Sequence, residues 1–446
     1  MKVRLLLLYL LISIYTPLLA QFNQPSPKYE ARAVWLTTIG GIDWPHSYAQ
    51  TPSSIDRQKR ELVAILDKLQ KAGINQVLLQ TRIRATTIYP SVYEPWDGCL
   101  SGRPGKSPGY DALAFAIDEC HCRGMELHAW VVAIPVGKWN GAGCRNLRKR
   151  NLKMLKRIGD EGFLNPEMPQ TAGYIADICE EIVRNYDVDG IHLDYIRYPE
   201  NWNIKVTPTQ GRSFITRIVK AIHDRIKPIK PYVKLSSAPI GKHDDLTRYQ
   251  SYGWNAYRRV CQDAQGWLRD GLMDQLFPMM YFQGRQFFPF AIDWSENSYG
   301  RIVTPGLGIY FLSPKEKDWP LEIISREMHV LRQYGLGHAF FRSKFFTDNT
   351  KGIYDFTLKH NASPALVPPM TWANSTAPAA PTCLALDRNH VLTWQKTVAG
   401  GDIYYNVYSS PSHPVDITDG RNLIAARVSG NAVRVGNLDR MYYAVT

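Results

Sequence analysis

One stretch decides the fold: Val188-Asp189-Gly190-Ile191-His192-Leu193-Asp194-Tyr195-Ile196-Arg197-Tyr198-Pro199. Its apolar centre, bounded by Asp-Gly before it and a carboxylate after it, is typical of a buried strand. In a (β/α)₈ barrel the C-terminal ends of the strands carry the catalytic side chains, which makes Asp194 the candidate catalytic residue. Two alternatives stay open. In the first, Asp194 is a structural or ligand-orienting carboxylate and not a catalytic one. In the second, Asp189-Gly190 is an ordinary turn that enters a strand.

Strand-like apolar runs alternate with helical periodicity on both sides of this stretch, which indicates βα units and a parallel sheet. Besides the stretch itself, the predicted strands are 31–38, 75–84, 125–133, 233–238, 274–281, 302–310 and 337–342. The predicted helices are 53–72, 111–122, 172–186, 210–226, 254–270 and 321–334. Eight units with long loops after the first four strands predict an α/β fold, a (β/α)₈ TIM barrel over 28–360. An open doubly wound sheet is the alternative, but the glycine fingerprint expected after its first strand is missing.

The segments outside the predicted barrel differ from it in composition. Residues 1–20 combine two basic residues with an apolar run, which predicts a signal peptide and a secreted, periplasmic or envelope-associated protein. Residues 361–381 are rich in Ala, Pro, Ser and Thr and are predicted to be a linker. Residues 382–446 contain short alternating strands around Trp394, which resemble a fibronectin type III module without its last strand. The unpaired edge would offer a surface to an envelope protein partner.

The charge of the chain is strongly positive, +13. A basic exported protein is attracted to acidic envelope polymers or to membrane surfaces. Nucleic acid is the rival partner, but no long unbroken Lys/Arg run supports it, so we expect no nucleic-acid binding. The densest basic cluster runs from Arg145 to Arg157 and holds seven Lys or Arg residues. We interpret that cluster as a solvated surface.

The seven cysteines are scattered, and their odd number is too low for a disulfide framework. Cys120-His121-Cys122 has no second ligand pair nearby, so we interpret it as part of a helix and not as a zinc site. We therefore expect neither a metal nor an organic cofactor.

Five motifs occur in an order that is specific. They are Glu30-Ala31-Arg32-Ala33-Val34-Trp35-Leu36-Thr37, Pro108-Gly109-Tyr110-Asp111, Met125-Glu126-Leu127-His128-Ala129-Trp130, Leu164-Asn165-Pro166 and the stretch from Val188. Together they resemble the glycosyl-hydrolase-like 10 family over about residues 28–350. The resemblance implies a (β/α)₈ glycoside hydrolase. Family members include an envelope enzyme of cell division that cleaves peptidoglycan glycan strands stripped of their stem peptides.

The stretch around Asp194 is also similar to two other barrel families. Its Asp-Gly-x-x-x-Asp layout is similar to the strand-four region of alpha-amylase-like enzymes, and that resemblance makes Asp194 the nucleophile. The chitinase-type pattern Asp-Gly-x-Asp-x-Asp-x-Glu is similar too. Here, however, His192 replaces an Asp and Ile196 replaces the catalytic Glu. Chitinase-style catalysis with that Glu is therefore not expected.

Glycosidic hydrolysis needs an acid for the leaving oxygen and a carboxylate that attacks or stabilises the anomeric carbon. Asp194 is predicted to be the carboxylate, kept ionised by Arg197 and Tyr198. Of the acid candidates we favour Glu94, because Pro95 and Trp96 give it an apolar setting that raises a pKa. A solvated loop carboxylate is the alternative for Glu94. The other candidates are Asp43, Asp97 and Glu200.

Several polar and aromatic residues are predicted to contact the substrate. Gln80, Arg82 and Arg84 share one face of a strand, and Arg forks suit carboxylates such as that of muramic acid. An internal ion pair is the alternative for one Arg. The remaining predicted contacts are His128, Trp130, His192, Arg197, Tyr198 and Tyr281. The alternative for His192 is a hydrogen-bonded position in the barrel core. Each aromatic residue has the same alternative, a place in the core.

These residues predict an exported glycoside hydrolase whose partners are peptidoglycan glycan strands or another polysaccharide. A hydrolase of another glycan, such as an alpha-glucan, is the second hypothesis. A non-catalytic glycan-binding envelope scaffold is the third.

Overall fold

The computed structural model describes residues 27–251, 253–396, 403–436 and 441–446. The predicted signal peptide, residues 1–20, lies outside these ranges. The chain divides into two compact units. The large unit comprises Glu30–His360 with Leu366–Ala379, and the small unit consists mainly of Ala380–Thr446.

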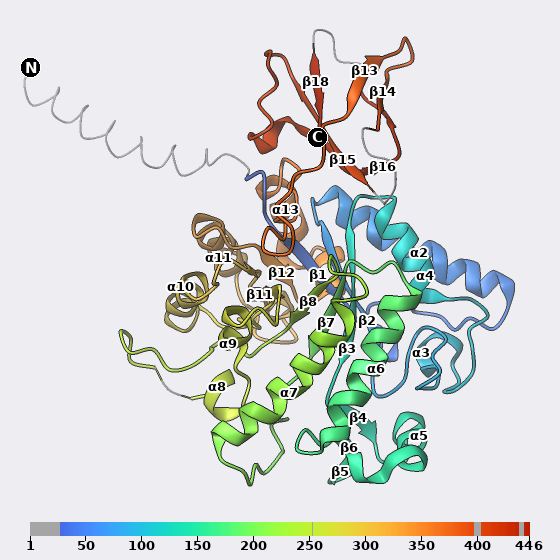
Figure 1. Cartoon of the computed structure of the whole chain (residues 1–446), viewed down its shortest axis with the longest axis vertical. Coiled ribbons are helices and arrows are strands. Elements are labelled where there is room, and N and C mark those ends of the chain that lie inside the picture. The colour runs from blue at the N-terminus through green and yellow to red at the C-terminus, as the bar shows by residue number, and fades with distance from the viewer. Residues whose placement is uncertain (1–26, 252, 397–402, 437–440) are drawn as a thin grey trace, which may run out of the picture. The chain divides into compact units, whose positions relative to one another are not determined.

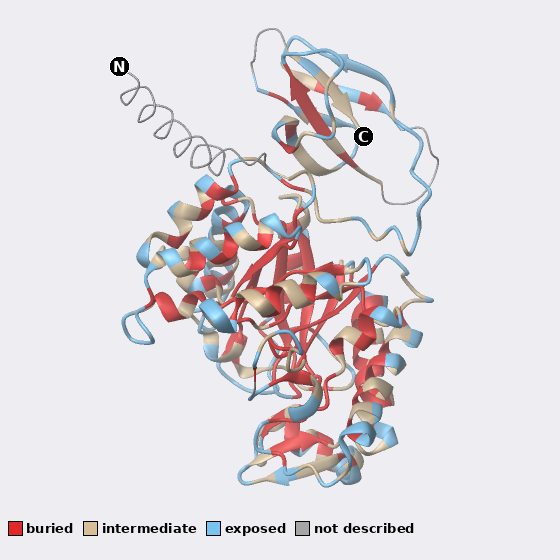
Figure 2. Ribbon diagram, turned by 90° about the vertical axis from the view of Figure 1, so that its left-hand side faces the viewer, coloured by how far each residue is buried: buried red, intermediate tan, exposed pale blue. Residues whose placement is uncertain are grey.

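A curled parallel sheet of nine strands forms the centre of the large unit (Figure 1). The strands lie in the order β10-β9-β8-β7-β3-β2-β1-β12-β11. Their bounds are β1 Arg32–Leu36, β2 Gln76–Arg82, β3 Glu126–Val132, β7 Gly190–Asp194, β8 Lys234–Ser237, β9 Gln275–Leu276, β10 Ile302–Val303, β11 Gly306–Leu307 and β12 His338–Phe340. Figure 2 shows these strands buried among helices whose outer faces are exposed. Such burial on both faces explains why the strands read as continuous apolar runs.

The two outermost strands of this order, β10 and β11, belong to one extended segment, 302–307. On one side the segment is bonded to β9, because the N–H of Thr304 donates to the carbonyl of Leu276 at 2.8 Å. On the other side the N–H of Phe341, just after β12, donates to the carbonyl of Leu307 at 3.0 Å. A single segment therefore contacts both ends of the sheet.

The helices of the large unit begin and end where local signals place them. Thr51 and Ser54 form a capping box at the start of α2, and Thr207 and Gln210 form one at the start of α7. The helix bounds are α2 Pro52–Lys71, α3 Gly98–Ser101, α4 Ala112–His121, α5 Ala142–Asn151, α6 Pro169–Asn185, α7 Pro208–Ile226, α8 Ala256–Arg259, α9 Ala264–Arg269, α10 Phe288–Glu296, α11 Leu321–Gln333, α12 Ser343–Thr347 and α13 Ile353–His360. Short 3₁₀ turns are η1 Ile39–Gly41, η2 Leu152–Met154, η3 Gly284–Gln286, η4 Ile309–Leu312 and η5 Thr350–Gly352.

The predicted helix over 254–270 is wrong in one respect, because the structure divides it into α8 and α9. Cys261 has a φ of 58°, in the left-handed region, which ends a right-handed helix. The side chain of Asp263 then accepts a hydrogen bond from the N–H of Gly266 at 3.1 Å and starts α9.

Residues 134–165, which we call the insertion, leave the sheet after β3. The insertion contains α5 and a small antiparallel sheet in the order β4-β6-β5. The bounds of its strands are β4 Pro135–Lys138, β5 Leu155–Ile158 and β6 Glu161–Leu164. The sequence shows only a long segment here, because strands of four residues are too short to display a clear alternation.

The small unit contains two antiparallel sheets of three strands each, β13-β14-β17 and β16-β15-β18. Their bounds are β13 Thr382–Leu386, β14 Val391–Gln395, β15 Tyr404–Ser410, β16 Leu423–Ser429, β17 Ala432–Arg434 and β18 Tyr442–Val445, with the 3₁₀ turn η6 at Gly420–Asn422. Buried Trp394 packs against Tyr405 with ring centroids 5.2 Å apart, at the centre of the core of this unit. The short strands predicted around Trp394 are present.

The segment predicted as a linker, 361–381, is divided between the two compact units. Residues 366–379 pack with the large unit. There the indole N–H of Trp372 donates to Oδ1 of Asp274 at 2.9 Å, and the Arg301 guanidinium lies 4.5 Å from the Trp372 ring. Among the described residues, no helix combines the length and the apolar character needed to cross a bilayer.

Candidate active site

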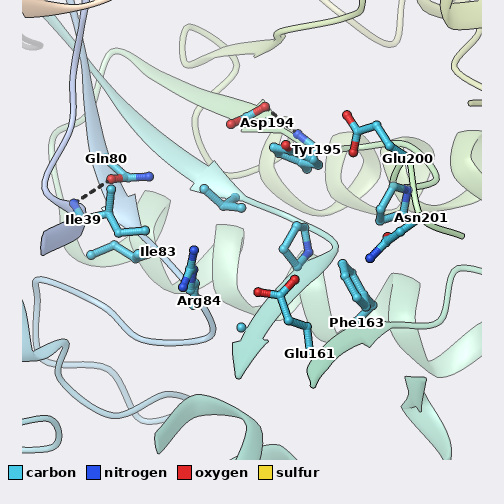
Figure 3. Close-up of a pocket in the computed structure, with 14 residues that line it drawn as sticks. Ile39, Gln80, Ile83, Arg84, Glu161, Phe163, Asp194, Tyr195, Glu200 and Asn201 are labelled. Atoms are coloured by element: carbon cyan, nitrogen blue, oxygen red, sulfur yellow. Dashed lines mark hydrogen bonds between the residues drawn. The ribbon is translucent and has the colours of Figure 1, made fainter. Parts of the chain in front are cut away.

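A cavity of about 290 Å³ lies at the C-terminal ends of β2, β3 and β7 (Figure 3). Its walls come from β2 and the turn after it, from the insertion, and from the end of β7 and the loop that follows. The lining residues are Ile39, Gln80, Ile83, Arg84, Val132, Pro135, Gly137, Glu161, Phe163, Asp194, Tyr195, Pro199, Glu200 and Asn201. This is the end of a parallel sheet at which α/β enzymes build their sites.

Asp194 ends β7 and reaches this cavity with 8% of its surface exposed. Burial raises the pKa of its carboxyl, and the positive charge of Arg197 opposes that rise. The N–H of Tyr195 donates to Oδ1 at 2.7 Å, and the indole N–H of Trp130 donates to Oδ2 at 3.2 Å. Both hydrogen bonds favour the ionised form. The side chain is thus a positioned carboxylate, the type of group that attacks or stabilises an anomeric carbon.

Tyr195 follows Asp194 in a conformation that non-glycine residues rarely adopt, with a φ of 51°. Its N–H is one of the two donors to Asp194, and its ring lies 4.3 Å from the Arg197 guanidinium. A strained residue of this kind costs about 1–3 kcal/mol and is found most often at functional sites. The strain therefore supports Asp194 as a functional residue and not as part of an ordinary strand end.

Arg197 lies behind Asp194 and is not among the cavity-lining residues. Its side chain is 3% exposed and donates to Oε1 of Glu200 at 2.6 Å and to the carbonyl of Tyr198 at 3.2 Å. These bonds correct the prediction that Arg197 binds substrate. Its positive charge opposes the rise in the pKa of Asp194, but burial is the larger effect, so the net shift is upward.

Arg84, predicted to contact the substrate, lines the cavity, and its side chain is exposed. Within the described parts of the chain its guanidinium has no hydrogen-bond or ion-pair partner. Its side chain packs on Gly137, where a Cβ atom would lie 2.7 Å from Cδ of Arg84. Gly137 also has a φ of 85°, so glycine is required there both for the backbone and for the close approach. The arrangement leaves the Arg84 fork free to bind an anion.

Glu161 is the functional candidate that sequence reasoning missed. It begins β6 of the insertion and is half-buried at the cavity wall. Its carboxylate makes no hydrogen bond or ion pair with any residue that the structure describes. The other two cavity carboxylates have partners, Asp194 as above and Glu200 in its bond to Arg197. Figure 3 shows the Glu161 side chain in the same cavity as Asp194.

Glu94, the favoured acid from the sequence, lies in a buried ion pair with Arg82. Nε and Nη2 of Arg82 donate to the two Glu94 oxygens at 2.8 and 2.7 Å, and the Tyr174 hydroxyl donates to Oε1 at 2.8 Å. Neither Glu94 nor Arg82 lines the cavity. Both site predictions are corrected, because the two side chains satisfy each other inside the protein. The internal ion pair that the sequence leaves open for one Arg is the one formed by Arg82.

His192 and His128 are fully buried and do not line the cavity. His192 accepts a hydrogen bond from the indole N–H of Trp35 at 3.1 Å, and its Nδ1 lies 3.1 Å from the Ser236 hydroxyl. Burial lowers the pKa of His192 well below its ordinary value, so its ring is neutral. His128 is fully buried with Nε2 3.1 Å from Oε2 of Glu126. Both histidines are core residues, which corrects their prediction as substrate contacts.

Three aromatic residues predicted as sugar contacts have other surroundings. Trp130 is buried and serves Asp194 as a hydrogen-bond donor. Tyr198 is fully buried against Trp202, with ring centroids 5.5 Å apart, and belongs to the hydrophobic core. Tyr281 does not line the cavity. Burial is the main cause of its raised pKa, and the Asp194 charge adds to the rise. The predicted sugar contacts of Trp130 and Tyr198 are therefore corrected.

The remaining acid candidates are structural. Asp43 accepts hydrogen bonds from the Thr37 hydroxyl at 2.6 Å and from the Arg342 guanidinium. Asp97 caps α3 by accepting from the N–H of Cys99 at 2.7 Å. Neither side chain lines the cavity.

Three possible metal-ligand side chains, Glu30, His338 and His360, cluster elsewhere in the large unit, and all are buried. Glu30 accepts from Nε of Arg32 at 2.6 Å and from Nη2 of Arg332 at 2.7 Å. Two guanidinium groups therefore hold the carboxylate and repel a cation. Among the described residues this is the one cluster with metal-ligand geometry, and its chemistry does not fit a metal.

A positioned carboxylate in a cavity at the strand ends is typical of an α/β enzyme. Comparison with known proteins gives the family. The model of the family described as Glycosyl hydrolase-like 10 matches residues 30–210 and 209–311. The chain belongs to this family and is a glycoside hydrolase.

Two curated relatives and one solved structure illustrate the likeness. Glycosyl hydrolase YngK of Bacillus subtilis (strain 168) is 31% identical over 400 residues, which are 81% of this chain and 78% of that protein. Glycosyl hydrolase DigH of Escherichia coli (strain K12) is 29% identical over 289 residues, covering 56% of this chain and 65% of that protein. The fold is similar to that of alpha-L-fucosidase isoenzyme 2 from Paenibacillus thiaminolyticus, with a TM-score of 0.50 and 15% sequence identity. The matched region covers 75% of this chain and 49% of that one.

Proposed function

We propose that this glycoside hydrolase is exported and cleaves the glycan of bacterial cell walls, of the peptidoglycan type, after its stem peptides have been removed. The observation that carries the proposal is Asp194, a buried carboxylate with a fixed donor on each oxygen at the wall of a strand-end cavity. The same cavity holds the carboxylate of Glu161 and the guanidinium of Arg84. Two carboxylates and one cation suit the cleavage of a carboxylate-bearing sugar chain.

Asp194 attacks or stabilises the anomeric carbon in this mechanism, and Glu161 protonates the leaving oxygen. Glu161 takes the role first predicted for Glu94, because Glu94 is held by Arg82 and Glu200 by Arg197.

The closed (β/α)₈ barrel is part of the proposal. Counted as one segment, β10 and β11 make eight strand positions in the sheet. The bonds of segment 302–307 to both β9 and β12 support closure. In a closed barrel the ends of β2, β3 and β7 face one shared opening, which is where the cavity lies.

The substrate class follows from charge. Muramic acid exposes a carboxylate once its peptide is removed, and Arg84 has its donors free in the cavity. The net charge of +13 favours association with acidic envelope polymers. Export is supported by the sequence of residues 1–20. We further propose that the small unit is a fibronectin type III-like module that binds an envelope partner. Its two antiparallel sheets around Trp394 support this assignment.

Purified protein and three variants test the proposal on amidase-stripped glycan strands, with the soluble sugars measured by mass spectrometry. The variants are Asp194→Asn, Glu161→Gln and the control Asp160→Asn, an exposed neighbour of Glu161. We expect release by the parent and the control, no release by Asp194→Asn, and a loss of roughly 10²–10⁴-fold for Glu161→Gln. On an aryl glycoside, whose leaving group needs no proton, Glu161→Gln should lose far less.

Undiminished release by Asp194→Asn would show that this carboxylate is not catalytic. Release from an alpha-glucan but not from stripped strands would replace the substrate by the second hypothesis. Binding of the strands without cleavage of any polysaccharide would return the scaffold hypothesis.

A further inference from the structure

The insertion, residues 134–165, carries a large share of the positive charge of the chain. It has eight Lys or Arg residues against two acidic residues, a net charge of +6 where the whole chain has +13. The eight are Lys138, Arg145, Arg148, Lys149, Arg150, Lys153, Lys156 and Arg157. An ordinary solvated surface has both signs interspersed, so this excess calls for an external anion.

The cations of the insertion are not neutralised from within. Among the residues that the structure describes, only Lys138 pairs with a carboxylate, that of Asp160 at 3.2 Å. Arg150 and Arg157 donate instead to backbone carbonyls, those of Val92 at 2.8 Å and Gly159 at 3.0 Å. Carbonyl contacts fix these side chains without cancelling their charge.

The Trp139 indole ring contacts two of these guanidinium groups. The Trp139 ring has Arg148 at 4.9 Å and Arg157 at 5.5 Å from its centroid. The ring also packs on Gly162, where a Cβ atom would lie 3.4 Å from Cε3. These cation–π contacts restrict both guanidinium groups before any ligand binds, which reduces the entropy lost on binding.

The insertion that carries these cations borders the cavity, and one of the cations, Lys156, lies on the cavity side. Glu161 and Phe163 line the cavity from β6, and Lys156 of β5 lies directly opposite Phe163 in the antiparallel register. Directly opposite residues share a face of the sheet, so Lys156 lies on the side of the cavity. Its Nζ is 4.1 Å from the ring of Trp202, which follows the cavity residue Asn201.

We infer that the insertion is a binding platform for a carboxylate-bearing polysaccharide chain that continues out of the cavity. The inference rests on the proposed function and specifies the substrate class of that same site. Carboxylates repeat along such a chain, and guanidinium forks bind planar carboxylates in a bidentate way. The position of the charge beside a glycosidase cavity favours a glycan over a membrane surface or a nucleic acid.

Binding is measured in the Asp194→Asn background, so that no cleavage interferes. The probes are amidase-stripped glycan strands and the same strands with their carboxyl groups reduced to alcohols. The platform variant replaces three exposed cations of the insertion by Gln: Lys149, Lys153 and Arg157. The control variant makes the same charge change at exposed positions elsewhere: Lys71, Lys106 and Lys359.

We expect the platform variant to raise Kd for the carboxylated strands on the order of tenfold at low salt, with a weaker salt dependence than the parent. Neither variant should change Kd for the reduced strands, and the control should change neither value. Equal binding of both strand types by the parent, or equal effects of the two variants, would overturn the inference. Phosphatidylglycerol vesicles serve as a third probe. If the platform variant lost binding only to these vesicles, the platform would be assigned to a membrane surface instead. Cleavage that depends on Asp194 is measured separately. The proposed function can therefore fail or stand independently of the binding result.

Discussion

The indole N–H of Trp130 on β3 donates a hydrogen bond of 3.2 Å to Oδ2 of Asp194 on the adjacent strand β7. In the parallel register Asp194 lies beside Val132, and Trp130 is two residues earlier on the same face of β3. The Trp130 ring therefore fills the sheet interior, and its indole N–H fixes the position of the Asp194 carboxylate. A residue predicted to stack on sugar is instead a positioning residue for the candidate nucleophile.

Replacing Trp130 by Phe removes this donor and keeps an aromatic ring. Because the hydrogen bond favours the charged carboxylate, its loss raises the pKa of Asp194 further. We expect kcat to fall by roughly tenfold or more with little change in KM. The acidic limb of the pH profile of kcat/KM should move to higher pH. An unchanged limb would show that Trp130 contributes only to packing.

Glu94→Gln is expected to lower the free energy of unfolding. We do not expect it to abolish catalysis in protein that remains folded. The change leaves the Arg82 guanidinium buried without its counter-charge, which costs about 3–5 kcal/mol of the free energy of unfolding. Urea unfolding measures the loss. The double variant Glu94→Leu with Arg82→Met removes both charges and should recover most of it. A Glu94→Gln protein that is fully stable but inactive would restore Glu94 as the acid.

Glu327 on α11 is 1% exposed, and within the described residues neither carboxyl oxygen has a hydrogen-bond partner. Burial raises its pKa from 4.5 to about 9. Between these pH values the unfolded chain releases a proton that the folded chain retains, so stability falls as the pH rises. We expect the stability of Glu327→Gln relative to the parent to grow by roughly 1 kcal/mol per pH unit between pH 5 and 8.

Urea unfolding at four pH values measures this difference for Glu327. The exposed Glu322 lies on the same helix, and Glu322→Gln is the matched control that should follow the parent at every pH. A pH-independent difference for Glu327→Gln would mean that this carboxyl ionises normally in the folded protein.

Arg84→Gln tests the recognition of a substrate carboxylate inside the cavity. The Arg84 guanidinium has no competing partner in the described structure, so its loss should act on substrate alone. We expect KM for stripped glycan strands to rise on the order of tenfold, with kcat nearly unchanged. Carboxyl-reduced strands should show no rise. An equal effect on both substrates would mean that Arg84 contacts hydroxyl groups or only shapes the cavity.

Local rules were sufficient for the elements that carry the site. The apolar run that ends at Asp194 is β7, and Thr51 and Thr207 begin α2 and α7 as capping residues do. Residues two apart on a strand point to the same face, so the sequence also places His192 on the face of Asp194. Parity does not give depth, however. His192 lies two residues, about 6.6 Å, further from the strand end, where the interior is filled by Trp35 and Ser236.

The sequence by itself determined the α/β alternation and the carboxylate at the end of β7, because both follow from periodicity along one segment. Only the tertiary structure decided which acid accompanies it. Arg82 takes Glu94 out of the candidate site through an ion pair that no spacing rule predicts. Antiparallel pairing in the insertion brings Glu161 to the cavity instead. Both outcomes depend on contacts between segments, and the periodicity of a single segment holds no information about its partner.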